Sequence, residues 1–162
     1  MLLNLTRKAD YAVRAMLDVA VHHPEMRNTR QISTGMDLPR NLLRQILAAL
    51  VRHGFLHSAP GPAGGYTLAR PPGEITLREV MEVIEGPVAI DSCMLSGGPC
   101  DWEQACPVHE IWVRARTGLE TGLATTFDHL AEVDRAIRAG TYRIPEDTPT
   151  HPTVPPRLGQ DD

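Results

Sequence analysis

The sequence predicts a mostly α-helical protein that carries one small β-hairpin. Apolar residues recur at steps of three and four through most of the chain, which is the spacing of amphipathic helices. Residues 55–70 depart from that spacing, because two short apolar runs there flank a dense group of glycines and prolines. With 162 residues, 42% of them hydrophobic, the chain can form one core with an appendage but not two full domains.

The first predicted helix follows Thr6, which is suited to be its N-cap, and ends before Pro24. Its spacing of apolar residues predicts an amphipathic helix with one buried face. That face comprises Ala9, Val13, Met16, Leu17, Ala20 and Val21.

Two helices then follow in tandem, a pattern typical of a helix-turn-helix. Residues 29–37 form one or two helical turns around Ile32, and the next helix begins with Pro39 and is capped at Gly54. One face of this second helix is apolar, and the other is basic and amide-rich. Since arginine is suited to guanine in the major groove, we predict base contacts from that face; the alternative is a solvated polar surface. The predicted contacts are Arg40, Asn41, Arg44 and Gln45.

The hairpin after the second helix would form a wing, with Gly61, Gly64, Gly65 and Tyr66 in and around its turn. A helix with a capping box from Thr76 to Glu79 follows it and ends at Gly86. We therefore predict that residues 1–86 form a winged helix-turn-helix DNA-binding domain.

A long helix is predicted from Pro107 and a last one up to Gly140. The long helix has an apolar stripe that a core this small can hardly cover, so we expect residues 107–140 to be dimerisation helices that form a homodimer; the alternative is a helix folded back on its own domain. Residues 141–162, rich in proline, are expected to be a disordered tail. The stripe comprises Val108, Ile111, Trp112, Ala115, Leu119, Gly122 and Leu123, and the last helix is expected to turn Phe127, Leu130, Val133 and Ile137 inward.

Charge is distributed unevenly along the chain. Residues 1–71 hold nine Arg or Lys against four Asp or Glu, whereas residues 72–162 hold seven against sixteen. A polyanion such as DNA should therefore meet the first half, where Arg7, Lys8 and Arg30 are predicted phosphate contacts. The chain shows neither a signal-peptide pattern nor a long apolar run, so we expect a cytoplasmic protein with no membrane partner.

All three cysteines lie in residues 87–106, and a histidine follows closely in the spacing C-x6-C-x5-C-x2-H. Three thiolates and one imidazole can hold a zinc ion or an iron-sulphur cluster. Zinc sites usually take their cysteines in close pairs, so the wide spacing favours the larger cluster. We expect residues 87–106 to be a cluster-binding loop. The predicted ligands are Cys93, Cys100, Cys106 and His109.

The motifs "LTRKADYAVRAMLDVA", "GPAGGYTLAR" and the three spaced cysteines resemble the Rrf family of winged-helix transcription regulators, which includes IscR-, NsrR- and RirA-like members. The resemblance runs from about Leu5 to Gly140. It implies a homodimeric regulator, generally a repressor and sometimes an activator. Its iron-sulphur cluster would sense iron-sulphur supply, redox state or nitric oxide and control DNA binding.

Within that resemblance the fourth ligand stays open. The "CPVH" sequence looks like the IscR pattern, in which His109 would complete a 2Fe-2S site, the favoured cofactor. Asp10 matches the position from which NsrR-like members supply a carboxylate of the other subunit to a 4Fe-4S cluster, the alternative cofactor. The chain also departs from IscR-like members, with Arg44 in place of a glutamate and Pro60 in place of the wing arginine, so its operator need not resemble theirs.

Other classes of function explain less of the chain. An iron-sulphur electron carrier or cluster-delivery protein would account for the cysteines but leave the basic first half without a use. A zinc-stabilised interaction domain is a third possibility. No paired carboxylates, nucleophile and base, or phosphate loop stands out, so we expect no enzyme.

Overall fold

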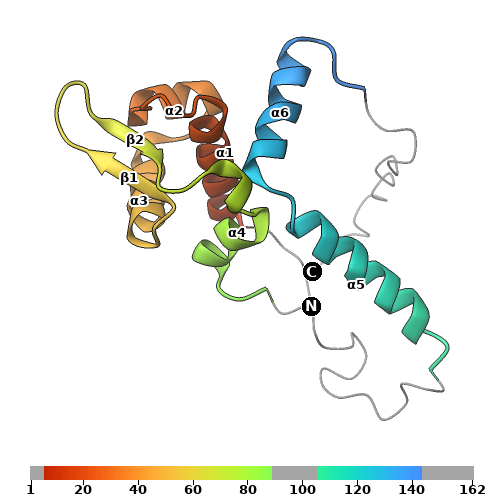
Figure 1. Ribbon diagram of the computed structural model, residues 1–162. Helices are drawn as coiled ribbons and strands as arrows, with labels where there is room; N and C mark the ends of the chain where they lie inside the picture. Colours follow the sequence, from red (N-terminus) through yellow and green to blue (C-terminus); the bar gives the residue numbers. More distant parts are fainter. Residues whose placement is uncertain (1–5, 89–105, 144–162) are drawn as a thin grey trace, which may run out of the picture.

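Helix α1 is the central element of the fold. The computed structural model describes residues 6–88 and 106–143. In it α1 spans Arg7–Val21, and α2, α3, α4 and α6 all contact it (Figure 1). The Thr6 side chain accepts a hydrogen bond from the backbone N–H of Ala9 at 3.3 Å, so the predicted N-cap is confirmed.

Helices α2 (Thr29–Met36) and α3 (Arg40–Arg52) form the predicted tandem pair. Asn28 and Gln31 make a reciprocal capping box at the start of α2. Asp37 ends α2 in the left-handed region with φ of 52°, which turns the chain sharply into α3. The prediction for Pro39 was wrong by one position: it is the N-cap, because its extended backbone follows directly from the turn.

Strands β1 (Leu56–Ala59) and β2 (Gly65–Leu68) form the predicted antiparallel hairpin. An isolated bridge joins Arg27 to Tyr66 on the free side of β2, with N···O distances of 2.9 Å in both directions. Gly65 is required there, because a Cβ atom would lie 2.7 Å from the carbonyl oxygen of Arg27. The hairpin is therefore held against the start of the helix-turn-helix.

A 3₁₀ turn, η1 (Pro72–Glu74), leads into α4 (Leu77–Glu85), which has the predicted capping box and ends at Gly86. Helix α5 (His109–Leu123) begins two residues later than expected, because Pro107 and Val108 form a turn closed by the bond from the N–H of His109 to the carbonyl of Cys106.

Helix α6 (Phe127–Arg138) packs beside α1. Phe127 is fully buried, whereas the inward prediction for Ile137 was wrong, since its side chain is 56% exposed. Ile137 lies roughly a quarter turn around the helix from Phe127, so its side chain does not face the core. Near the C-terminal end of α6, Arg135 faces α1 and donates to the carbonyl of Val21 at 3.4 Å.

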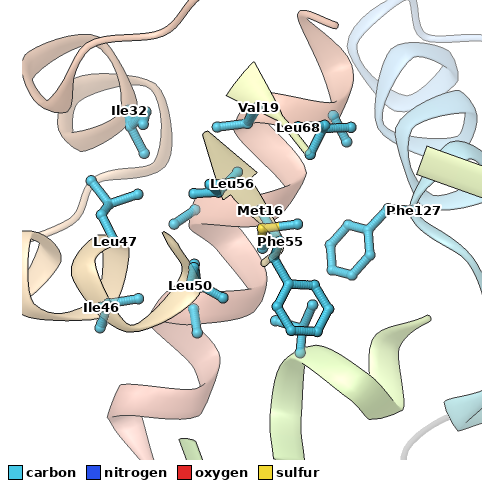
Figure 2. Close-up of a cluster of buried hydrophobic side chains, with 14 of the residues drawn as sticks. Met16, Val19, Ile32, Ile46, Leu47, Leu50, Phe55, Leu56, Leu68 and Phe127 are labelled. Atoms are coloured by element: carbon cyan, nitrogen blue, oxygen red, sulfur yellow. The ribbon is translucent and has the colours of Figure 1, made fainter. Parts of the chain in front are cut away.

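The core joins every part of the domain. Figure 2 shows side chains from α1, α2, α3, the hairpin and α6 pointing toward one another. The fold is therefore mostly α-helical with a small wing, as predicted. Among the labelled core residues are Met16, Val19, Ile32, Ile46, Leu47, Leu50, Phe55, Leu56, Leu68 and Phe127.

Helix α5 differs from the other helices in its exposure. Leu123, at its end, is its one buried residue, and the helix extends away from the body of the molecule (Figure 1). Ile111 is 68% exposed and Val108, just before the helix, is 44% exposed. Within the described residues, the apolar stripe of α5 is thus largely uncovered.

Candidate functional site

The outer face of α3 is set by the burial of its inner face. Leu43, Ile46, Leu47 and Leu50 are buried in the core. The turn before α3 is closed by the Ser33 hydroxyl, which is buried and donates to the carbonyl of Leu38 at 2.6 Å. As a result the predicted base-contact residues all lie exposed on one side of the helix: Arg40, Asn41, Arg44 and Gln45.

Asn41 is partly engaged within the helix. Its Oδ1 accepts the backbone N–H of Leu42 at 2.9 Å, which satisfies one of the free donors at the helix start. The side chain is left with amide N–H groups to offer outward. A bidentate contact to adenine needs both a donor and an acceptor, so Gln45 is better placed than Asn41 for that role.

The cations of the described chain fall into two groups. Seven arginines form ion pairs with described acids, namely Arg14, Arg27, Arg70, Arg78, Arg114, Arg116 and Arg138. Eight exposed cations make no such pair with a described acid: the predicted DNA contacts Arg7, Lys8, Arg30, Arg40 and Arg44, together with Arg52, Arg135 and Arg143. The stretch from Leu38 to Gly73, with α3 and the hairpin, contains no acid. Along this stretch no carboxylate would repel an anion, and the exposed Asp37 lies just before it at the end of α2.

The other predicted contacts lie at the starts of two helices and in the hairpin. Arg7 and Lys8 open α1, and Arg30 is the second residue of α2. In the wing, Gly61 lies in the turn with φ of 103°, a conformation that favours glycine. The remaining wing residues, Gly64, Gly65 and Tyr66, enter and begin β2.

Sequence reasoning missed the ion pair between Asp18 and Arg27. Arg27 donates from Nε to Oδ2 at 2.9 Å and from Nη2 to Oδ1 at 3.1 Å, and both side chains are largely buried. Because the backbone of Arg27 also pairs with Tyr66, this contact ties α1 to the wing. An acid among the apolar residues of the α1 face was the available signal.

The predicted cluster ligands are only partly within the described residues. Cys93 and Cys100 lie outside them. Cys106 is a half-buried free thiol, and His109, also half-buried, is the first residue of α5. Their backbones are joined by the turn bond of 3.2 Å, so two of the four predicted donors lie within one helical turn. Over residues 6–88 and 106–143, no three His, Cys, Asp or Glu side chains come together as a metal site.

Asp10, the alternative ligand, has a partner in its own helix. Its Oδ1 accepts from Arg14 Nε at 3.0 Å, in a pair whose two side chains are almost half exposed. Thr6, one turn earlier, hydrogen-bonds through its backbone N–H and hydroxyl to Glu85, the last residue of α4. The start of α1 is thus joined to the end of α4, shortly before the cysteine segment begins.

A small apolar cluster, which we call the lower cluster, holds both sides of the cysteine segment to the domain. Met81 of α4 and Leu123 of α5 are buried in it, and Val13 of α1 and Val88 pack against them. Val88 is held further by backbone bonds: its N–H donates to Glu82 Oε1 at 3.1 Å, and its carbonyl accepts from Arg78 at 3.2 Å. The cysteine segment therefore follows Val88 and precedes α5, and both Val88 and the C-terminal end of α5 pack in the lower cluster.

Comparison with known proteins identifies relatives along most of the chain. The profile of the Rrf2 family, described as an iron-dependent transcriptional regulator, matches residues 5–132. The transcriptional regulator IscR of Xenorhabdus nematophila is 35% identical over 111 residues, which cover 68% of this chain and 67% of the relative. IscR of Citrobacter koseri is 29% identical over 163 residues, covering 96% of this chain and 99% of the relative.

Solved structures of similar regulators share the fold. CymR, the global cysteine regulator of B. subtilis, superposes with a TM-score of 0.67 at 26% identity, over 81% of this chain and 98% of the other. IscR of T. potens gives a TM-score of 0.61 at 27% identity, over 83% of this chain and 90% of the other. No helix within the described residues is long and apolar enough to cross a membrane.

Proposed function

Because the chain belongs to the Rrf2 family of transcriptional regulators, we propose that it is a homodimeric repressor whose operator affinity is set by an iron-sulphur cluster. Its fold and its relatives are those of transcriptional regulators and not of enzymes. The observation that carries the DNA-binding part is the outer face of α3, which lies in a stretch without acids and exposes cations that pair with no acid among the described residues.

The proposed ligands are Cys93, Cys100, Cys106 and His109, with 2Fe-2S as the favoured cofactor. The donor set fits, since soft thiolates and an imidazole are the usual protein ligands of iron-sulphur clusters. Cys106 and His109 lie within one turn at the start of α5, whereas Asp10 would have to leave Arg14. The iron-dependent description of the family supports the same cofactor. When bound, the cluster would supply a centre sensitive to iron supply, oxidants and nitric oxide.

The lower cluster offers a route from the cysteine segment to the DNA-binding face. Val88 and Leu123 pack with Val13 of α1, and α1 also packs on α3. A shift of Val88 or α5 would therefore move the helix that supports the recognition helix. Such couplings are typically worth about 1–3 kcal/mol, which changes DNA affinity roughly 5- to 150-fold.

The first test is native mass spectrometry and visible spectroscopy of the anaerobically purified full chain. We expect dimers that carry a 2Fe-2S cluster and that bind a duplex selected from random sequence with different affinity once the cluster is removed. His109→Ala should lose or alter the cluster's absorption, while His129→Ala, a change of an exposed histidine in α6, should not. A 4Fe-4S cluster that is lost in Asp10→Ala would instead favour Asp10.

Other outcomes would contradict the proposal. Zinc in place of iron would indicate an interaction domain, and a cluster without salt-dependent DNA binding would indicate an electron carrier. DNA binding by a protein that takes up no metal would leave a regulator with another signal. A protein that binds DNA equally well with and without its cluster would remove the sensing mechanism.

A further inference from the structure

The outer face of α3 continues beyond the four predicted base contacts. Gln45, Ala48 and Arg52 are exposed and recur at steps of three and four, so they follow one another along one side of the helix. Arg52 is the last residue of α3. This exposed stripe therefore runs the full length of the recognition helix and has a cation at its far end.

Arg52 shares the electrostatic setting of Arg40 and Arg44. No ion pair joins it to an acid among the described residues, in contrast to the seven paired arginines named above. It also lies within the stretch from Leu38 to Gly73, which has no acid. A cation in the last helical turn stabilises the helix through its dipole, but that role does not require its neighbours in sequence to lack acids.

The length of α3 separates the two ends of the stripe. The twelve residue-to-residue steps from Arg40 to Arg52 correspond to about 18 Å along the axis, at 1.5 Å per step. The major groove is about 12 Å wide and curves around the duplex. Because the helix is straight and the groove curves, a helix whose first turns lie on base edges moves away from the bases toward its far end, where its last turn can reach the sugar-phosphate backbone.

We propose that Arg52 is a phosphate anchor and that α3 is divided into two functional parts. Arg44 and Gln45, in the second turn, read bases, and Arg52, about 10–12 Å further along the helix, binds a backbone phosphate and sets the angle of the helix in the groove. This inference rests on the proposed function, because it assumes that α3 enters DNA.

The test compares single variants of the full chain on two duplexes: one selected by the wild type from a random pool, and one unrelated sequence of equal length. Arg52→Ala should weaken binding to both duplexes by the same factor, roughly 3- to 10-fold, and lower the slope of log affinity against log salt by about 1. Arg52→Lys should restore most of the loss, since an ammonium also binds phosphate. Arg44→Ala should instead change the base selected at one position of each half-site.

The matched control is Arg138→Ala, which removes an arginine paired with Asp134 on α6 and should leave the salt slope unchanged. Thermal unfolding of each variant separates loss of binding from loss of folding. An Arg52→Ala protein with wild-type affinity and salt slope, or one that alters base preference, would overturn the inference. A wild type that binds no duplex would overturn the proposed function itself.

Discussion

Asp18 is the buried charge of the described chain, and its surroundings are shaped around it. Its side chain is 2% exposed, Arg27 binds both carboxylate oxygens, and Gly35 leaves them space, because a Cβ atom there would lie 2.6 Å from Oδ1. A buried carboxylate is costly without a partner, so this contact requires Arg27 at the start of the helix-turn-helix. Asp18 of α1 thus contacts Gly35 of α2 directly, and it is linked to the wing through Arg27, whose backbone pairs with Tyr66.

Replacing Asp18 by Ala should destabilise the fold by about 3–5 kcal/mol, since it leaves the Arg27 guanidinium buried without its partner. The measurement is urea unfolding followed by circular dichroism. Asp10→Ala is the matched control in the same helix: it breaks the exposed pair with Arg14 and should cost less than about 1 kcal/mol. Equal effects of the two substitutions would show that Asp18 has no special structural role.

At the scale of single elements, the start of α4 shows how local bonds connect the wing to the second half of the chain. Glu79 caps the backbone N–H of Thr76 at 2.8 Å and accepts from Arg70 at 2.8 Å. Arg70 also lies over the ring of Phe55, 5.0 Å from its centre. Burial raises the pKa of Glu79, but the hydrogen bonds from Thr76 and Arg70 outweigh it and hold that pKa below its usual value of 4.5.

The lowered pKa gives a pH-dependent contribution to stability. The carboxylate stabilises the fold fully above about pH 4.5, and the contribution is lost as the pH falls through the lower folded-state pKa. Glu79→Gln should cost about 0.5–1 kcal/mol at pH 7, a modest value because more than a third of the side chain is exposed and screened.

Urea unfolding at pH 7 and at pH 3 checks this expectation. The difference between wild type and Glu79→Gln should shrink at the lower pH, where a protonated carboxyl resembles the amide. Glu132→Gln, on the exposed side of α6, serves as the control and should change stability little at either pH. A difference that grows in acid would contradict the assigned sign.

At the scale of the whole molecule, the two apolar clusters share α1. The main core joins α1 to α2, α3, the hairpin, α6 and, through Val80, α4, and the lower cluster joins α1 to α4 and α5. Leu119 and Leu123 of the α5 stripe pack in the lower cluster, whereas Val108 and Ile111, at the other end of the stripe, are exposed where α5 extends from the body of the molecule (Figure 1). An exposed stripe of this kind is better covered by a second copy than left in water, which supports the proposed dimer.

Substitution of Ile111 by Glu should convert the dimer to monomer, because a carboxylate would be buried in the proposed helix-to-helix contact. Sedimentation velocity measures the change, expected as at least a 10-fold weaker dimer, equivalent to about 1.4 kcal/mol. Thr117→Glu puts the same charge on the opposite side of α5 and is the control. If Ile111→Glu remains as dimeric as Thr117→Glu, the apolar stripe is not the interface.

Much of the candidate site was predictable because its signals are local. The outer face of α3 is the complement of an apolar pattern, so Arg44 and Gln45 could be assigned without coordinates, and the caps at Thr6 and Glu79 were readable from short motifs. Arg52 was missed, since a basic residue at a helix end already has a local explanation. Arg52 differs from the other unpaired arginines Arg135 and Arg143 in lying within the acid-free stretch from Leu38 to Gly73, where no described acid pairs with it.

The sequence by itself determined where each helix lies to within about two residues, where the wing turns, and which side chains α3 offers outward, because periodicity, caps and glycines act over a few residues. Tertiary structure alone decided that Arg27 meets Asp18, that Phe127 enters the main core while Ile137 stays exposed, and that Val88 and Leu123 share a cluster. These contacts join residues from different elements, and their pairing depends on how helices pack in space, which no local pattern specifies.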